Sequence, residues 1–236
     1  METTLDGLRD VKLYQRKEGY RFSVDALLLY SFVNVTHVKD AVDLGAGSGV
    51  IGLLLARKYP GAKILLVELQ QTLYKLAVRN IGLNGLTDRV NALLMDISSV
   101  HEAYPAMSCD IVVSNPPYRK PLSGRLSQGE ERAVARHEVS LRLPELAKAA
   151  AHLLRSRGRF FMIFHPERLV EIIDALRAEN LEPKRIRFVH NDSGSVSKIV
   201  LVEAVKEGRA GLKVERPLIL YNKEGSYTEE VKAMYE

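Results

Sequence analysis

The most specific chemical signal in the chain is the motif Asn115-Pro-Pro-Tyr118, which follows the apolar run Asp110–Ser114. Proline lacks an N–H and has a fixed φ, so Pro116 and Pro117 predict a rigid turn that cannot join a strand ladder. The carbonyl oxygens at the start of this turn would face a ligand, and Tyr118 offers a flat ring for stacking on a base. Two acceptors set against a planar NH₂ group can localise its lone pair on nitrogen. The motif therefore predicts chemistry on such a nitrogen, although a Pro-Pro pair alone is more often a plain turn.

A glycine-rich turn, Gly45-Ala-Gly-Ser-Gly49, follows the predicted strand Asp40–Leu44 and opens a predicted helix. Glycines allow a backbone to approach a ligand closely. A dinucleotide-binding turn would have glycine at its sixth position, where this chain has Val50. The acid that precedes the turn instead suits a ligand with a positively charged amino group. The turn thus favours S-adenosylmethionine over NAD, with a site that includes Asp43, Gly45, Gly47 and Gly49.

Two further acids end predicted strands, Glu68 after the run from residue 63 and Asp96 after Val90–Met95. Glu68 can accept hydrogen bonds from both ribose hydroxyls, and Asp96 can accept one from the amino group of an adenine. Leu69 and Ile97 adjoin these acids and belong to the same predicted site, where Ile97 would cover one face of the adenine. The plainer alternatives are a solvated surface acid for Glu68 and a helix N-cap for Asp96.

Short apolar runs rich in β-branched residues alternate with helical patterns along most of the chain. This alternation predicts a Rossmann-like α/β fold: a doubly wound, seven-stranded, mostly parallel sheet. Parallel strands end at one edge of such a sheet, so the four polar clusters are expected to meet there. Two late runs, Arg185–His190 and Ser197–Val205, predict an antiparallel C-terminal hairpin. Near the N-terminus, two short strands are expected around Lys17-Glu-Gly19, followed by a helix over Val24–Phe32.

Composition sets weaker limits on function. Lysine and arginine number 34 against 29 acids, a net charge of +5 that permits a polyanionic partner without requiring one. The single cysteine, Cys109, excludes an intrachain disulfide and a cysteine-based zinc cluster. No apolar run is long enough to span a bilayer, and the N-terminus does not resemble a signal peptide. We therefore expect a cytoplasmic protein with no metal and no membrane partner.

Taken together, these motifs resemble those of class I S-adenosylmethionine-dependent methyltransferases that modify planar nitrogens. The stretch from Gln15 to Leu28 and the sequence Ala135-Arg-His-Glu138 narrow the resemblance to the bacterial tRNA1(Val) adenine-N6 methyltransferase group. The resemblance implies S-adenosyl-L-homocysteine as product and, as target, an adenine N6 in RNA, in the tRNA(Val) anticodon loop. It assigns catalysis to Asn115, Pro116, Pro117 and Tyr118. It also implies that Phe22, Ser23 and Asp25 close over the cofactor, although Asp25 could simply favour a helix N-terminus.

The resemblance also implies how the chain is organised. We expect residues 1–34 to form an N-terminal extension, a β-hairpin plus a helix, that covers the cofactor site, and residues 35–236 to form the methyltransferase domain. The protein is expected to be a monomer.

Other functions are compatible with the same motifs. A protein glutamine N5-methyltransferase also acts on a planar amide, but only about forty residues precede the glycine turn, too few for a separate recognition domain. An rRNA base is a closer competitor as the substrate. A non-catalytic RNA-binding scaffold that keeps the methyltransferase fold is the alternative outside enzymes, and the presence of Asn115 and Tyr118 argues against it.

Overall fold

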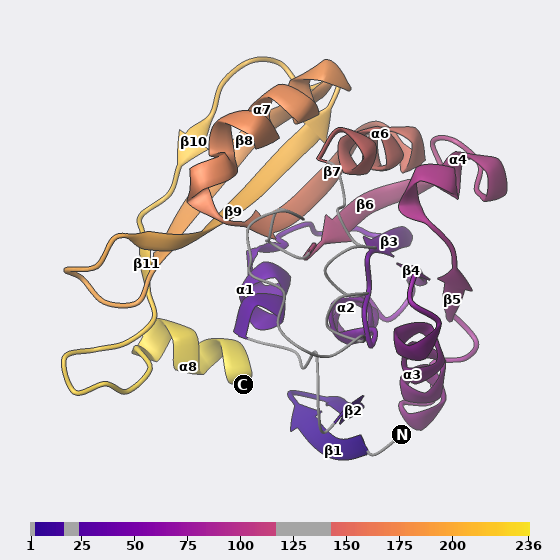
Figure 1. Cartoon of the computed structure of the whole chain (residues 1–236), viewed down its shortest axis with the longest axis horizontal. Coiled ribbons are helices and arrows are strands. Elements are labelled where there is room, and N and C mark those ends of the chain that lie inside the picture. The colour runs from indigo at the N-terminus through magenta and orange to yellow at the C-terminus, as the bar shows by residue number, and fades with distance from the viewer. Residues whose placement is uncertain (1–2, 17–23, 117–142) are drawn as a thin grey trace, which may run out of the picture.

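A central β-sheet runs through the part of the chain that the computed structural model describes, residues 3–16, 24–116 and 143–236 (Figure 1). Its seven longer strands lie in the order β8-β9-β7-β6-β3-β4-β5. Strand β9 is antiparallel to both β7 and β8, whereas β3, β4, β5, β6 and β7 pair in parallel. The mostly parallel sheet and the antiparallel C-terminal hairpin are thus confirmed. Two short strands extend the sheet by pairing with β8, namely β10 (Lys213–Val214) and β11 (Leu218–Ile219).

The long strands lie close to the predicted apolar runs. They are β3 (Asp40–Leu44), β4 (Lys63–Glu68), β5 (Val90–Leu94), β6 (Cys109–Ser114), β7 (Leu154–Phe164), β8 (Leu181–His190) and β9 (Ser197–Lys206). The helices that precede, connect and follow these strands are α1 (Val24–Phe32), α2 (Val50–Lys58), α3 (Gln71–Leu83), α4 (Val100–Ala103), α6 (Leu143–Leu153), α7 (Leu169–Ala178) and α8 (Glu229–Tyr235). Short 3₁₀ turns lie at Ile97–Ser99 and Pro166–Arg168. Within these described ranges, no helix is both long and apolar enough to cross a membrane.

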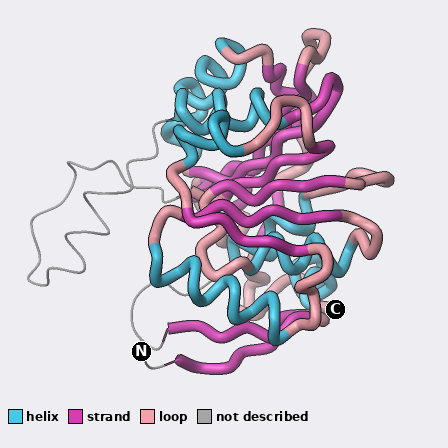
Figure 2. The backbone as a smooth tube through the Cα atoms, turned by 90° about the vertical axis from the view of Figure 1, so that its right-hand side faces the viewer, coloured by secondary structure: helices cyan, strands magenta, loops and turns pink. Residues whose placement is uncertain are grey.

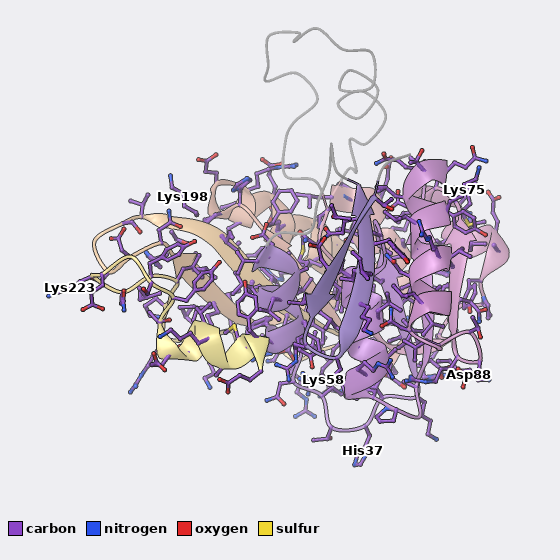
Figure 3. All side chains as sticks on the ribbon, turned by 90° about the horizontal axis from the view of Figure 1, so that it is seen from below. His37, Lys58, Lys75, Asp88, Lys198 and Lys223 are labelled. Carbon is purple, nitrogen blue, oxygen red and sulfur yellow. The ribbon has the colours of Figure 1, made fainter. Side chains whose placement is uncertain are left out.

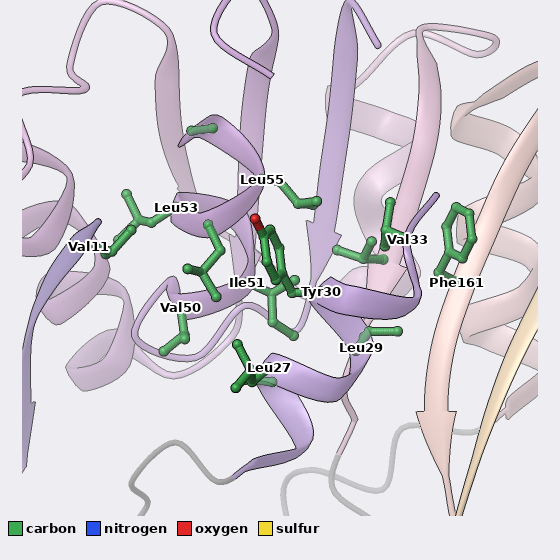
Figure 4. Close-up of a cluster of buried hydrophobic side chains, with 14 of the residues drawn as sticks. Val11, Leu27, Leu29, Tyr30, Val33, Val50, Ile51, Leu53, Leu55 and Phe161 are labelled. Carbon is green, nitrogen blue, oxygen red and sulfur yellow. The ribbon is translucent and has the colours of Figure 1, made fainter. Parts of the chain in front are cut away.

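Successive residues of each strand point to opposite faces of the sheet, and each face has its own core. On one face, Leu66, Val113 and Phe161 pack with α1, α2 and α3. Figure 4 shows part of this core, where side chains of α1 and α2 lie together and Val33, just after α1, lies beside Phe161 of β7. On the other face, Val67 and Val112 pack with α6 and α7. Helices on both faces are the property that defines a doubly wound sheet.

The N-terminal hairpin differs from the predicted one. Strand β2 (Val11–Arg16) pairs with β1 (Thr3–Leu8), and the chain turns at Arg9 and Asp10, with Arg9 at a φ of 52°. We expected two short strands around Lys17-Glu-Gly19 to form the hairpin. That expectation was wrong for the first of them, because β2 pairs with β1 on its N-terminal side; residues 17–19 lie outside the described residues. Burial of Leu8, Val11 and Leu13 in the same core as α1, α2 and α3 explains the observed pairing, because it places the apolar side of the hairpin on the core.

Figure 2 shows this hairpin as a separate pair of strands beyond the helices that cover the central sheet. The hairpin, α1 and α2 contribute to one continuous core, so packing marks no boundary between residues 1–34 and 35–236. That division of the chain stays a prediction.

Candidate functional site

The carboxyl ends of β3, β4, β5 and β6 meet at one edge of the sheet. Register pairs Leu44 with Val67, Glu68 with Leu94, and Asp43 with Val113, so the residues that follow these strands leave the sheet side by side. The glycine turn, Glu68, Asp96 and Asn115 are therefore brought together at this edge, as the sequence predicted.

The glycine turn depends on conformations that favour glycine. Gly45, Gly47 and Gly49 have φ values of 76°, 59° and 88°. The first N–H groups of the turn, those of Gly45 and Ala46, donate to the carbonyl oxygen of Val67 at 2.9 and 3.0 Å. A Cβ at Gly49 would lie 2.9 Å from Cδ1 of Leu66, so a side chain there would be strained by the positive φ and would also require Leu66 to shift. The turn is thus held tightly against β4.

Asp43 lies beneath this turn, with only 1% of its surface exposed. Its Oδ2 accepts a hydrogen bond from the N–H of Gly52 at 3.0 Å, in the first turn of α2. Gly49, at the N-cap position of α2, has no side chain to cap the helix, so the carboxylate of Asp43 satisfies one of its unpaired N–H groups. Among the described residues, Oδ1 of Asp43 has no hydrogen-bond partner. Burial raises the pKa of Asp43 to about 7, with a smaller contribution from the negative charge of Glu68.

Glu68 is also buried, and both of its carboxylate oxygens accept backbone hydrogen bonds. Oε2 accepts from the N–H of Gly47 at 2.7 Å, and Oε1 accepts from the N–H of Gln70 at 2.8 Å. Burial raises the pKa of Glu68, and these backbone N–H groups partly offset the rise. Each carboxylate oxygen retains a second lone pair, so the side chain can bind the turn and a ligand hydroxyl together. Glu68 is therefore not the freely solvated surface acid of the plainer alternative.

Asp96 is exposed and caps the 3₁₀ turn at Ile97–Ser99. Its Oδ1 accepts from both the N–H and the hydroxyl of Ser98 at 2.8 Å. This is the N-cap alternative considered from the sequence, and it occupies one of the two oxygens. Ile97 is buried, and its Cδ1 lies 3.9 Å from the position of a Cβ on Gly45, so it lies against the glycine turn. Leu69 is 41% exposed beside Glu68.

Asn115 and Pro116 directly follow β6, with Asn115 half-buried and Pro116 buried. The preceding residue, Ser114, is fully buried, and its hydroxyl donates to the carbonyl oxygen of Leu44 at 2.7 Å. This bond joins the end of β6 to the end of β3, one residue before Asn115 and one residue before the glycine turn. Sequence reasoning missed Ser114, although its position beside the motif was a signal.

Four of the predicted site residues lie outside the described residues: Pro117, Tyr118, Phe22 and Ser23. Asp25 is described and lies in the first turn of α1, where an acid favours the helix N-terminus. Among the residues described, no group of three or more histidine, cysteine or acidic side chains is arranged to hold a metal ion.

The site fits a cofactor that carries an ammonium group, a ribose and an adenine. Two observations support this fit. Within the described ranges the buried Oδ1 of Asp43 has no hydrogen-bond partner, and three positive φ values in the turn above it bring the backbone close to the site. The two acids at the ends of β4 and β5, Glu68 and Asp96, each retain acceptor capacity at the same edge.

Comparisons with known proteins give a family and a set of relatives. The family model described as the methyltransferase small domain matches residues 22–178. A tRNA1(Val) (adenine(37)-N6)-methyltransferase of Aliivibrio salmonicida is 32% identical over 60% of this chain and 58% of that protein. The enzymes of the same name from Phocaeicola vulgatus and Pedobacter heparinus are 28% and 26% identical, over 80% and 91% of this chain and 79% and 88% of their own lengths.

Solved structures support the same fold. The crystal structure of a predicted O-methyltransferase from Agrobacterium tumefaciens has a TM-score of 0.74 at 25% identity, and the match covers 89% of this chain and 95% of that one. A geranyl diphosphate methyltransferase in complex with SAM has a TM-score of 0.58 at 13% identity, over 77% of this chain and 84% of that one. The second likeness bears on the fold alone.

Proposed function

The chain belongs to the methyltransferase small domain family, and from this premise we propose that it transfers the methyl group of S-adenosylmethionine to the N6 amino group of an adenine in RNA. We further propose that this adenine lies in the anticodon loop of tRNA(Val). Several relatives that match most of this chain carry the name of that activity, which supports the substrate. A monomeric state and a cytoplasmic location stay predictions.

The observation that carries the proposal is the juxtaposition of Asn115 with the glycine turn. The hydrogen bond from Ser114 to Leu44 fixes the ends of β6 and β3 to each other. An acceptor at Asn115 is therefore held beside a site that suits a sulfonium cofactor. This is the arrangement that direct transfer between the cofactor and a planar amine requires, because the two reactants need to be aligned and close.

We propose a role for each part of the site. Asp43 favours the ammonium group of the cofactor from beneath the turn, Glu68 accepts from its ribose, and Asp96 accepts from its adenine amino group through the oxygen that Ser98 does not use. The backbone at Gly45, Gly47 and Gly49 leaves room for the methionine part. Leu69 and Ile97 provide apolar contacts on either side of the adenine.

Catalysis rests on positioning and on hydrogen-bond acceptors. S-adenosylmethionine, when bound, supplies an activated methyl group on a sulfonium. Asn115 and the carbonyl of Pro116 accept from the two hydrogens of the target NH₂, which localises its lone pair on nitrogen. Attack by that nitrogen would form the new N–C bond as the methyl–sulfur bond of the cofactor breaks, so S-adenosylhomocysteine would leave as a neutral thioether and the new ammonium would lose its proton to water. Tyr118 is proposed to stack on the flipped base.

Positive charge near the site supports an RNA substrate. Lys75 in α3 and Lys198 in β9 are both exposed, and Figure 3 shows them on the side of the molecule opposite His37. Lys198 lies at the same sheet edge as Asn115, because Val200 of β9 pairs with Phe164 at the carboxyl end of β7. Lysines in these positions would contact phosphates on either side of a loop adenine.

Methyl transfer from labelled cofactor to total RNA and, separately, to total protein tests this proposal. We expect label in RNA of tRNA size and N6-methyladenine after nucleoside digestion. Label in rRNA would contradict the substrate, and label confined to protein would contradict the nucleic-acid assignment altogether.

A further inference from the structure

Two asparagines bind the outer edge of strand β2: Asn80 of α3 and Asn84, the C-cap residue of that helix. The side chain of Asn80 accepts from the N–H of Tyr14 at 2.7 Å and donates to its carbonyl oxygen at 3.1 Å. One helical turn later, Asn84 accepts from the N–H of Lys12 at 3.0 Å and donates to its carbonyl oxygen at 2.7 Å. Each amide thus pairs with both polar groups of one strand residue, as a neighbouring strand would. Figure 1 shows the hairpin beside α3.

The spacing of a helix and a strand explains why this pairing works. Residues four apart in a helix are about 6 Å apart along its axis, and residues two apart in a strand are separated by about 6.8 Å. Asn80 and Asn84 therefore match Tyr14 and Lys12, which expose their polar groups on the side of β2 that faces away from β1. The two amides dock the hairpin in a single register.

Asn80 makes a further bond that Asn84 does not make. Its Nδ2 also donates to the carbonyl oxygen of Ser48, inside the glycine turn, at 3.0 Å. Asn80 has no exposed surface, and Ala77, one turn earlier on α3, lies where a Cβ on Gly49 would contact it at 3.5 Å. One buried side chain is thus shared by the hairpin and by the turn proposed to bind the cofactor.

We propose that Asn80 is a positioning residue of the cofactor site, which couples docking of the N-terminal hairpin to cofactor binding. This inference rests on the proposed function only in assigning the glycine turn to the cofactor. A docked hairpin holds the amide of Asn80 in place through Tyr14, and the amide then fixes the carbonyl of Ser48 and the shape of the turn. By linkage, a cofactor that binds the ordered turn favours the docked hairpin by the same factor.

A purely structural role for Asn80, in which it only attaches the hairpin to α3, predicts a different result. If Asn80 only attached the hairpin, its effect on ligand binding would equal that of Asn84, which binds the same strand at a neighbouring residue. The two asparagines therefore form a matched pair. Substitution by aspartate keeps the acceptor but replaces the donating NH₂ with an oxygen that faces carbonyl groups.

The experiment measures the dissociation constant of S-adenosylhomocysteine by isothermal titration for the wild-type protein, Asn80→Asp and Asn84→Asp. We expect about a tenfold or larger increase for Asn80→Asp and a change within about twofold for Asn84→Asp, in the range of ordinary coupling between sites. Equal affinities of the two variants would overturn the inference alone. Absence of binding to the wild-type protein would overturn the proposed function and, with it, the inference.

Hydrogen exchange in the wild-type protein tests the same coupling without any variant. Saturation with S-adenosylhomocysteine should slow exchange of the Tyr14 amide, while amides between β8 and β9, which contact neither the hairpin nor the turn, should be unaffected. Unchanged exchange at Tyr14 in a protein that binds the ligand would contradict the coupling.

Discussion

The hydroxyl of Ser114 donates to the carbonyl oxygen of Leu44 across 2.7 Å, and neither residue has exposed surface. This bond ties the strand that leads to the acceptor motif to the strand that leads to the cofactor turn. Its consequence is alignment: a small shift of β6 against β3 would move Asn115 relative to the methyl group. In-line transfer is sensitive to such a shift, because its rate depends on the geometry of the reacting atoms.

Ser114→Ala should therefore reduce both turnover and stability while leaving cofactor affinity nearly unchanged. Loss of one buried hydrogen bond costs about 1–3 kcal/mol of unfolding free energy, whereas we expect kcat to fall about tenfold or more through misalignment. The dissociation constant of S-adenosylhomocysteine should stay within about twofold, because the glycine turn is held independently by Val67.

Ser108→Ala is the matched control for that variant. The hydroxyl of Ser108 is buried without a hydrogen-bond partner among the described residues, so its removal should leave both kcat and stability nearly unchanged. Equal kinetic effects of the two substitutions, measured with the same RNA, would contradict a special role for Ser114.

Cofactor affinity should depend on pH through Asp43. Burial raises its pKa to about 7, so the ligand-free protein holds a proton there under conditions in which an unfolded aspartate is ionised. Pairing with the ammonium group of the cofactor favours the ionised form, so affinity should rise between about pH 5.5 and 7.5 and binding should release a proton. Isothermal titration in buffers of different ionisation enthalpy measures that release.

The raised pKa of Asp43 also makes the stability of the ligand-free protein depend on pH. The folded ligand-free protein binds more protons than the unfolded chain between the ordinary value of 3.8 and about 7, so Asp43 makes the free energy of unfolding fall as the pH rises through this window. The pKa of Glu68 is raised as well, so Asp43→Asn is the control that separates the effect of Asp43 from that of Glu68. A pH dependence of affinity that persists in full in Asp43→Asn would assign it to another group.

Two glycine substitutions should have opposite effects on stability. Gly49→Ala places a Cβ at 2.9 Å from Leu66 in a residue with a φ of 88°, so it should lower the free energy of unfolding by more than about 1 kcal/mol and weaken cofactor binding. Gly82→Ala lies in α3, where a Cβ meets no atom within 4 Å, and should raise stability by about 0.5–1 kcal/mol. Urea unfolding of both variants checks the pair, and a stable Gly49→Ala protein with normal affinity would contradict the strained turn.

Local sequence signals were sufficient for the sheet and for the edge where the site lies. Strand β4 is apolar from Ile64 to Val67, and the glycine turn and the Pro-Pro pair mark where β3 and β6 end. The meeting of Asp43, Glu68 and Asn115 at one edge then followed from parallel topology. The pairing of β1 with β2 did not follow, because Asp6-Gly7 within β1 resembles a turn rather than a strand interior.

Contacts between distant residues explain the rest of what was missed. Asp43 was expected to face a ligand amino group, but its pairing with Gly52 depends on the closure of α2 over the turn. Asn80 looks like any polar residue of a surface helix until β2 and Ser48 are placed on either side of it. The terminal helix α8 carries no strong apolar pattern, and only Val231 among its residues is buried.

The most direct test of the proposed chemistry is methyl transfer to a tRNA(Val) transcript by the wild-type protein, Asn115→Ala and Asn115→Asp, with S-adenosylhomocysteine affinity measured on the same samples. We predict that Asn115→Ala lowers kcat by about two to three orders of magnitude at nearly unchanged ligand affinity, while Asn115→Asp, which keeps an acceptor oxygen, retains measurable activity. Transfer by Asn115→Ala at a rate close to that of the wild-type protein would contradict the role of Asn115 as the acceptor that activates the amine.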